Sequence, residues 1–250
     1  MTLIQEVILI LLFLLTSVIG VVTGSNSLIT VPAMFQFGID PKVAIATNMF
    51  GLTFMSIGAS IPFLRQGKVD IRRIWPLIAL TLISSTIGAL LAIWITAQSL
   101  KLAVSAAMIL MASFILLRSD AGVRPARAVS TRAAILTYVL AFLLGIYGGF
   151  YSGGYVTILT SVLIAFFGLT FSEAVASTKV INIFSSLVAT AVFMWQGLVD
   201  YTLGIILSVS MFAGAYIGAH YASKMNDRWL RYIFLAAVFF LAIKTLFDFF

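Results

Sequence analysis

The chain has no cysteine, a single histidine and very few charged side chains. Charged residues make up 9% of its 250 positions, whereas a soluble domain carries roughly a quarter. Hydrophobic residues make up 62%, and the mean hydropathy is +1.15. The lack of cysteine excludes disulfides and thiolate metal sites. The shortage of charge excludes a soluble enzyme, a nucleic-acid binder and a disordered chain, which leaves an all-α integral membrane protein.

Catalytic and nucleotide-binding motifs are also lacking. The sequence contains no Gly-x-x-x-x-Gly-Lys-Ser/Thr loop, no His-Glu-x-x-His motif and no carboxylate pair suited to acid–base catalysis. His220 lies at the end of an apolar run and is interpreted as a packing residue, while Asp70 and Asp200 precede spans and are interpreted as helix N-caps. We expect no metal, no cofactor and no enzymatic activity. A membrane-embedded enzyme or accessory subunit is a rival interpretation without a motif of its own.

Apolar runs long enough to cross a bilayer recur along the chain. Two further apolar stretches, 27–39 and 155–168, are shorter and follow segments that contain glycine and serine. Both fall short of the roughly 17–25 residues that a lipid-facing span needs, which favours half-helices or broken helices inside the protein. The eight long predicted spans are 4–23, 43–64, 74–97, 102–117, 133–150, 174–195, 202–222 and 232–249.

The second half of the chain repeats the first without a gap, so that Gly38 matches Gly168 and Asp70 matches Asp200. When 37–70 is aligned with 167–200, 12 of 34 positions are identical. Polar identities, such as Gln-Gly-x-Val-Asp at both 66–70 and 196–200, cannot come from a shared apolar composition. We predict two homologous transmembrane repeats, 1–118 and 132–250, joined by a basic cytoplasmic linker at 119–131.

Basic residues indicate how the two halves are oriented. The loop at 65–73 is basic and its equivalent at 195–203 is not, whereas this bias is reversed in the next pair of loops. If the short stretches also cross, each half has five crossings and 11 of the 15 Lys and Arg share one face. If they only dip in and return, each half has four crossings and one basic loop lies on the wrong side. The positive-inside rule therefore favours inverted repeats with five crossings each and both termini outside, in the inner (plasma) membrane, with cytoplasmic loops at 65–73, 118–132 and 224–231.

Lys179 lies within a predicted span. A lysine in the middle of a span costs roughly 2.5–3.5 kcal/mol on insertion scales, and such residues usually face a polar cavity. Thr178, Asn182 and Ser185 follow helical spacing and form a polar face beside it. The alternative is that Lys179 extends to the membrane interface and pairs with Glu173.

The glycine- and serine-containing breaks give a second indication of a site. A half-helix that begins inside the membrane directs free N–H groups and the positive end of its dipole into a cavity. Two such ends related by inversion would meet near the midplane and, with one ammonium group, form an anion site. The alternative is that these small residues only permit close helix packing. The candidate substrate-binding residues are Ser25, Asn26, Ser27, Thr47, Asn48, Ser152, Gly153, Gly154, Ser177, Thr178, Lys179 and Asn182.

Four short motifs occur in the same order in both halves: a glycine-containing run, an Ala-x-Ala-Thr or Ala-x-Ala-Ser-Thr segment, Gly-x-Val-Asp and Gly-Ala. This doubled set resembles the TauE/SafE sulfite exporter family, also called TSUP, over nearly the whole chain. Ser25-Asn26-Ser27 replaces the family's triple glycine, and Val162 stands where the second half would have a proline. The motifs lie at 24–32, 43–47, 67–70 and 88–89, and again at 153–154, 174–178, 197–200 and 218–219.

The resemblance implies transport of a small organosulfur or carboxylate anion. We expect a secondary transporter that exports sulfite or a sulfoacetate-like organosulfonate by alternating access. The alternatives are an anion channel, or a permease of the same fold for carboxylates such as lactate or glycolate. The expected partners are the small anion and the lipid bilayer, and a homodimer is compatible with the sequence.

Overall fold

The computed structural model describes residues 3–24, 26–100, 102–104, 106, 130–225 and 229. Within these ranges every regular element is a helix. Six of the described helices are long and apolar enough to cross a membrane. They are α1 (Leu3–Thr23), α3 (Pro41–Arg65), α4 (Ile71–Trp94), α6 (Thr131–Phe150), α8 (Phe171–Trp195) and α9 (Tyr201–Ala222).

These six helices agree with the predicted spans to within three residues at each end. Of the other two predicted spans, 102–117 is described only at 102–104 and 106, and 232–249 lies outside the described residues. The short stretches form α2 (Ser27–Gln36, 10 residues) and α7 (Tyr155–Phe167, 13 residues). These are only about 15 and 20 Å long, shorter than the ~30 Å hydrocarbon core of a bilayer. The prediction of half-helices is therefore confirmed.

Local signals that start and stop the helices recur in both halves. The side chain of Asp70 accepts from the Arg73 N–H at 3.1 Å, and that of Asp200 accepts from the Leu203 N–H at 3.0 Å, so both are N-caps as predicted. Glycines with positive φ form three pairs of equivalent positions in the two halves. They are Gly24 and Gly154, Gly38 and Gly168, and Gly67 and Gly197.

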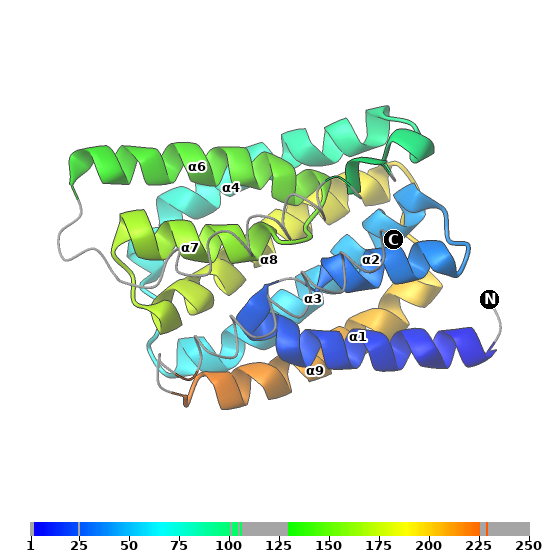
Figure 1. Cartoon of the computed structure of the whole chain (residues 1–250), viewed down its shortest axis with the longest axis horizontal. Helices are drawn as coiled ribbons and strands as arrows, with labels where there is room; N and C mark the ends of the chain where they lie inside the picture. The colour runs from blue at the N-terminus through cyan, green and yellow to red at the C-terminus, as the bar shows by residue number, and fades with distance from the viewer. Residues whose placement is uncertain are drawn as a thin grey trace.

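α3 and α8 form the centre of the bundle, with α4 and α6 packed together on one side and α1 and α9 on the other (Figure 1). Glycine allows the outer pairs to pack closely. A Cβ added at Gly88 would overlap the Ile146 carbonyl oxygen of α6, and one added at Gly218 would overlap the Val18 carbonyl oxygen of α1. Because Gly88 and Gly218 are equivalent residues, the same small-residue contact joins α4 to α6 and α9 to α1.

The contacts also define the direction of each helix. α3 and α8 are antiparallel, since Asn182 bonds Ser56 and Thr190 lies beside Thr53. The neighbours of the helix glycines show that α9 runs parallel to α3 and to α1, and that α4 runs parallel to α6. Lys42 at the start of α3 donates to the Ile93 carbonyl near the end of α4, so α4 is antiparallel to α3 and therefore parallel to α8. Each long helix of the first half therefore runs opposite to its equivalent in the second half.

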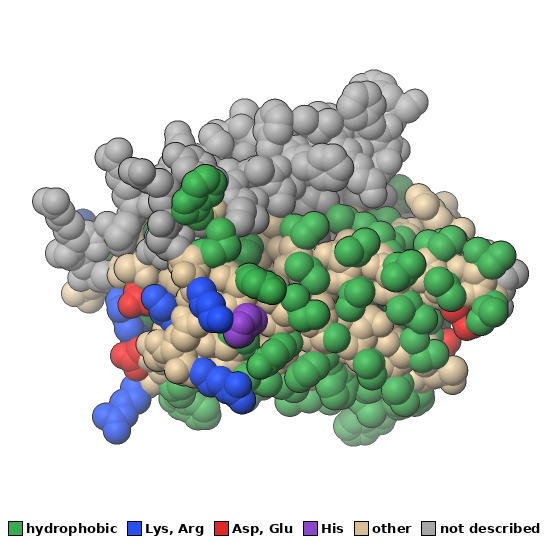
Figure 2. All heavy atoms as spheres, turned by 90° about the horizontal axis from the view of Figure 1, so that it is seen from below, with side chains coloured by type: hydrophobic (Ala, Val, Ile, Leu, Met, Phe, Trp, Pro, Cys, Tyr) green, Lys and Arg blue, Asp and Glu red, His purple; other side chains and the backbone are tan. Residues whose placement is uncertain are grey.

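Basic side chains gather at one end of the bundle, which we name the basic end; here α3 ends and α4 begins. Figure 2 shows this cluster of Lys and Arg beside a surface of hydrophobic side chains. Trp94 and Trp195 are exposed at the opposite end, and Trp75 is exposed near the basic end, as expected for aromatic belts at two membrane interfaces. The basic end holds Arg65, Lys68, Arg72, Arg73, Arg132 and Lys224.

Candidate functional site

Each short helix turns back along the long helix before it, so that α1 and α2 form one hairpin and α6 and α7 form another. The ring of Tyr138, near the start of α6, contacts that of Phe167 at the end of α7. The Arg73 guanidinium also donates to the Phe167 carbonyl, which places the open end of the α6–α7 hairpin at the basic end. α2 leads into the start of α3 at the opposite end. The two hairpins therefore enter the bundle from opposite ends.

The tips of the two hairpins touch inside the bundle. Thr157 Oγ1 donates to the Thr23 carbonyl at 2.6 Å, and Tyr151 Oη donates to the Ser27 carbonyl at 2.9 Å. Ser27 Oγ and Ser152 Oγ lie 3.4 Å apart. Gly24 must be glycine on two counts, since its φ is +69° and an added Cβ would lie 2.9 Å from the Thr157 nitrogen. These contacts close the middle of the bundle.

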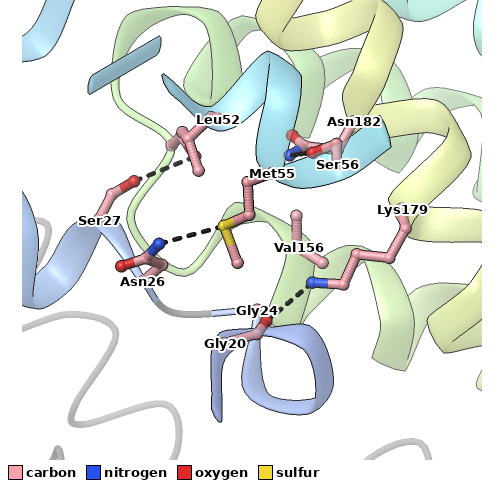
Figure 3. A pocket seen from close by; sticks show the side chains of 11 residues that line it. Gly20, Gly24, Asn26, Ser27, Leu52, Met55, Ser56, Val156, Lys179 and Asn182 are labelled. Atoms are coloured by element: carbon pink, nitrogen blue, oxygen red, sulfur yellow. Dashed lines mark hydrogen bonds between the residues drawn. The ribbon is translucent and has the colours of Figure 1, made fainter. Parts of the chain in front are cut away.

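A small cavity lies between the hairpin tips and the central helices (Figure 3). Leu52 and Asn182 are close to the midpoints of α3 and α8, so the cavity lies about halfway along the bundle. Its volume is about 10 Å³, which is room for roughly one water molecule. Its lining consists of Gly20, Gly24, Asn26, Ser27, Leu52, Met55, Ser56, Ser152, Val156, Lys179 and Asn182.

Lys179 extends into this cavity rather than to the membrane interface. Its side chain is only 3% exposed, and Nζ donates to the Gly20 carbonyl of α1 at 2.8 Å. Glu173, the acid proposed as its partner, instead accepts from the Thr170 N–H in the capping box of α8. The interface alternative is therefore wrong. Among the described residues Lys179 has no carboxylate partner, so its amine is a basic group of the cavity lining that no acid side chain neutralises there.

The cavity includes both members of two equivalent pairs, Asn26 with Val156 and Leu52 with Asn182. In each pair one residue is an amide and the other is apolar. Lys179 likewise has an apolar equivalent, Met49, which is buried in α3. The cavity thus lies at the boundary between the halves, and in each of these three equivalent pairs one residue is polar and the other is apolar.

The structure brings five of the predicted site residues together at the cavity: Asn26, Ser27, Ser152, Lys179 and Asn182. Asn48 stands behind them, where its Nδ2 donates to Ser27 Oγ at 2.9 Å. Gly153 accepts from Tyr147 Oη, and Gly154 is the left-handed N-cap of α7. Ser25 lies outside the described residues.

The remaining predicted residues do not line the cavity. Thr47 Oγ1 accepts from the Asp200 N–H at 3.1 Å and holds the start of α9 against α3. Thr178 Oγ1 lies 3.2 Å from Thr160 Oγ1, which ties α8 to α7, and Ser177 is buried in α8. Six residues of the lining were not among the predicted site residues, and Ser56 is the one of them with a polar side chain; it matches Ser186 in the repeat, but no other feature of the sequence pointed to it. The six are Gly20, Gly24, Leu52, Met55, Ser56 and Val156.

The side chains that line the cavity can bind a polar ligand. Lys179 supplies a basic group, while the two amides and three hydroxyls supply hydrogen bonds. No group of three His, Cys, Asp or Glu that could hold a metal ion occurs among the described residues. His220 lies elsewhere, exposed at the end of α9 with Nε2 2.8 Å from Lys224 Nζ.

Comparison with known proteins places this arrangement in a family. The sequence model of the Sulfite exporter TauE/SafE family matches residues 9–245. The chain belongs to this family. No solved structure matches the chain.

Members of the TauE/SafE family with similar sequences carry names that refer to transport. "Probable membrane transporter protein ORF9" of Sinorhizobium sp is 27% identical over 91% of this chain and 87% of the relative. A "Probable membrane transporter protein" of Haemophilus influenzae is 27% identical over 93% and 91%. "Probable membrane transporter protein YfcA" of Escherichia coli K12 is 25% identical over 94% and 87%. The chain is a multi-pass membrane protein of a transporter family.

Proposed function

We propose that the protein is a secondary transporter that exports a small anion, sulfite or a short organosulfonate, across the inner membrane. The observation that carries this proposal is the buried amine of Lys179, which faces a cavity halfway along the bundle without a carboxylate partner among the described residues. A bound anion would pair with its protonated form, and an ionisable side chain inside a membrane protein is typical of a substrate pathway.

The proposed mechanism is alternating access by two inverted repeats, with the hairpin tips as the moving barrier. Opposite directions of equivalent helices and paired left-handed glycines support the inverted repeat. The cavity as it stands has space for roughly one water molecule. A sulfonate is larger, so the tips must separate to admit it. Separation toward one end and then the other would expose Lys179 alternately to the two sides.

The basic end is proposed to face the cytoplasm. It collects six of the eight Lys and Arg that the structure describes, whereas Lys42 alone lies at the other end. This distribution follows the positive-inside rule. It also agrees with the five-crossing arrangement, in which loops 65–73 and 224–231 were predicted to share one face.

Exchange in proteoliposomes tests the proposed function. Vesicles with purified protein are loaded with unlabelled sulfite, sulfoacetate, sulfate, lactate or acetate, and uptake of the same labelled anion is followed at matched ionic strength. A carrier accelerates uptake when the same anion is present inside, because loaded sites return faster than empty ones. A channel shows no such acceleration.

Lys179→Met provides the matched control, because methionine is the equivalent residue at position 49. We expect accelerated uptake of a sulfur oxyanion or sulfonate by the wild-type protein and none by the variant. Equal uptake by both proteins, or no uptake of any anion in the panel by the wild type, would contradict the proposal.

A further inference from the structure

Lys179 has fewer hydrogen-bond partners in the closed cavity than a protonated lysine needs. Its Nζ has one partner among the described residues, the Gly20 carbonyl at 2.8 Å (Figure 3). That carbonyl also accepts from the Gly24 N–H at 2.9 Å, so it is shared. An ammonium group has three N–H donors. A shared carbonyl and a space for roughly one water molecule do not provide three acceptors.

No charged side chain of the described helices lies beside Lys179 to stabilise the protonated form. α1, α3, α4, α6 and α7 pack against α8, and their charged side chains all lie in the first or last turn of a helix. Glu173 of α8 is likewise in the first turn, where it forms the capping box. The charged residues of the packed helices are Glu6, Lys42, Arg65, Arg72, Arg73 and Arg132.

The tyrosines at the tip of the α6–α7 hairpin supply no negative charge either. Tyr147 Oη donates to the Gly153 carbonyl, Tyr151 Oη donates to the Ser27 carbonyl, and Tyr155 is buried beside them. Phenols keep their protons at neutral pH. A buried amine without a counter-charge is most stable without its extra proton, because an isolated buried charge is costly. A neutral amine still donates one N–H to the Gly20 carbonyl.

A bound sulfonate reverses this preference. It brings one negative charge and three acceptor oxygens, which match the single charge and the three N–H donors of a protonated lysine. The described lining of the cavity contains one basic group, so it balances a monovalent anion better than a divalent one. Lys179 therefore gains a proton when the anion binds and loses it when the anion leaves.

We propose that the protein transports one proton together with each monovalent organosulfonate, and that Lys179 Nζ carries this proton. On the loading side the amine takes a proton from water, and the ammonium group pairs with the anion. On the release side the anion leaves, the proton returns to water, and the neutral amine crosses back. Net transport carries no charge, and a high internal anion concentration drives export. This inference rests on the proposed function, because it adds a second transported species at the same site.

Proton entry during net anion uptake tests the inference. Proteoliposomes that contain pyranine as a reporter of internal pH receive external methanesulfonate or 2-hydroxyethanesulfonate at equal pH on both sides. Both are anions of strong acids, so neither carries a proton across lipid by itself. We expect the wild-type vesicles to acidify by one proton per anion, at a rate that an imposed membrane potential does not change.

Two results would overturn the inference without deciding the proposed function. One is uptake without acidification, or uptake whose rate follows the membrane potential; the anion would then move alone. The other is no uptake of either sulfonate. Exchange of labelled sulfite, measured in the same vesicles, would still uphold the proposed function in both cases.

Lys179→Arg locates the proton, because arginine keeps a cation but is not deprotonated in proteins. The variant should still exchange labelled for unlabelled sulfonate, while net uptake and acidification are lost, since its empty site cannot return uncharged. Lys42→Arg is the matched control at the end of the bundle and should keep all three activities. If Lys179→Arg does not fold, Lys179→Met should abolish acidification. Wild-type acidification in either Lys179 variant would overturn the assignment to Lys179.

Discussion

Replacing Lys179 with methionine should leave the stability of the protein almost unchanged or increase it, while removing its response to anions. A lysine inside a span costs roughly 2.5–3.5 kcal/mol on insertion scales. Its hydrogen bond to the Gly20 carbonyl returns about 1.5–3 kcal/mol, as hydrogen bonds to charged groups do. The Gly20 carbonyl also accepts from the Gly24 N–H at 2.9 Å, so it stays paired in the variant. The difference between these two contributions predicts a change in the free energy of unfolding of about −0.5 to about +2 kcal/mol.

Thermal unfolding of the purified protein in detergent measures both parts of this prediction. A ligand present at 100 times its dissociation constant stabilises a protein by about 2.7 kcal/mol. The wild type should show this shift with its substrate anion, and Lys179→Met should show none. Lys42→Met is the matched control, since Lys42 Nζ also donates to a carbonyl, that of Ile93 at 2.6 Å, but at the end of the bundle. It should keep the anion response.

A structural role for Lys179 would give the reverse pattern. The variant would then lose about 2 kcal/mol or more of unfolding free energy, as when a buried hydrogen-bond network is broken, and it would keep the stabilisation by anions. That result would refute the argument that the amine is held in the cavity at an energetic cost for the sake of binding.

Three other substitutions test the packing and the local geometry, each by the midpoint of thermal unfolding. Gly149→Val should cost more than the usual ~1–3 kcal/mol of overpacking, because a Cβ at Gly149 would overlap the Ser85 carbonyl oxygen; a midpoint equal to that of the wild type would contradict the close contact of α4 and α6. Gly24→Ala should destabilise clearly more than Gly38→Ala, because both glycines have a positive φ but only Gly24 is crowded, by Thr157 and Val156; equal losses would refute the tip contact. Asp200→Ala should cost about 1 kcal/mol through the lost N-cap of α9, and no loss would show that the cap is redundant.

Much of the fold could be predicted from the sequence, because a bilayer requires long apolar helices and helix ends carry local signals. The bounds of α1, α6 and α9 followed from hydropathy, and the short helices followed from their length. How the two hairpins touch could not be predicted. The contacts of Tyr151 with Ser27 and of Thr157 with Thr23 join residues that are far apart in the chain, and no local pattern records them.

The candidate site was only partly predictable for a related reason. Polar residues present in both halves, such as Thr47 and Ser177, looked like site residues, yet Thr47 anchors the start of α9. Three polar residues of the cavity lining break the repeat, since Asn26, Lys179 and Asn182 have Val156, Met49 and Leu52 as their equivalents, whereas Ser56 keeps its match in Ser186. Agreement between the halves was therefore not enough to identify the residues of the cavity.

The central claim is that an anion passes between hairpin tips that must separate, and a reversible cross-link tests it most directly. The chain contains no cysteine, so Ser27→Cys with Ser152→Cys introduces the only two thiols, at positions whose hydroxyl oxygens are 3.4 Å apart. With cross-linking followed by mass spectrometry and each single variant as control, oxidation should stop anion exchange in proteoliposomes and reduction should restore it. Unchanged exchange in the fully cross-linked protein would show that the tips do not need to separate and would contradict the account.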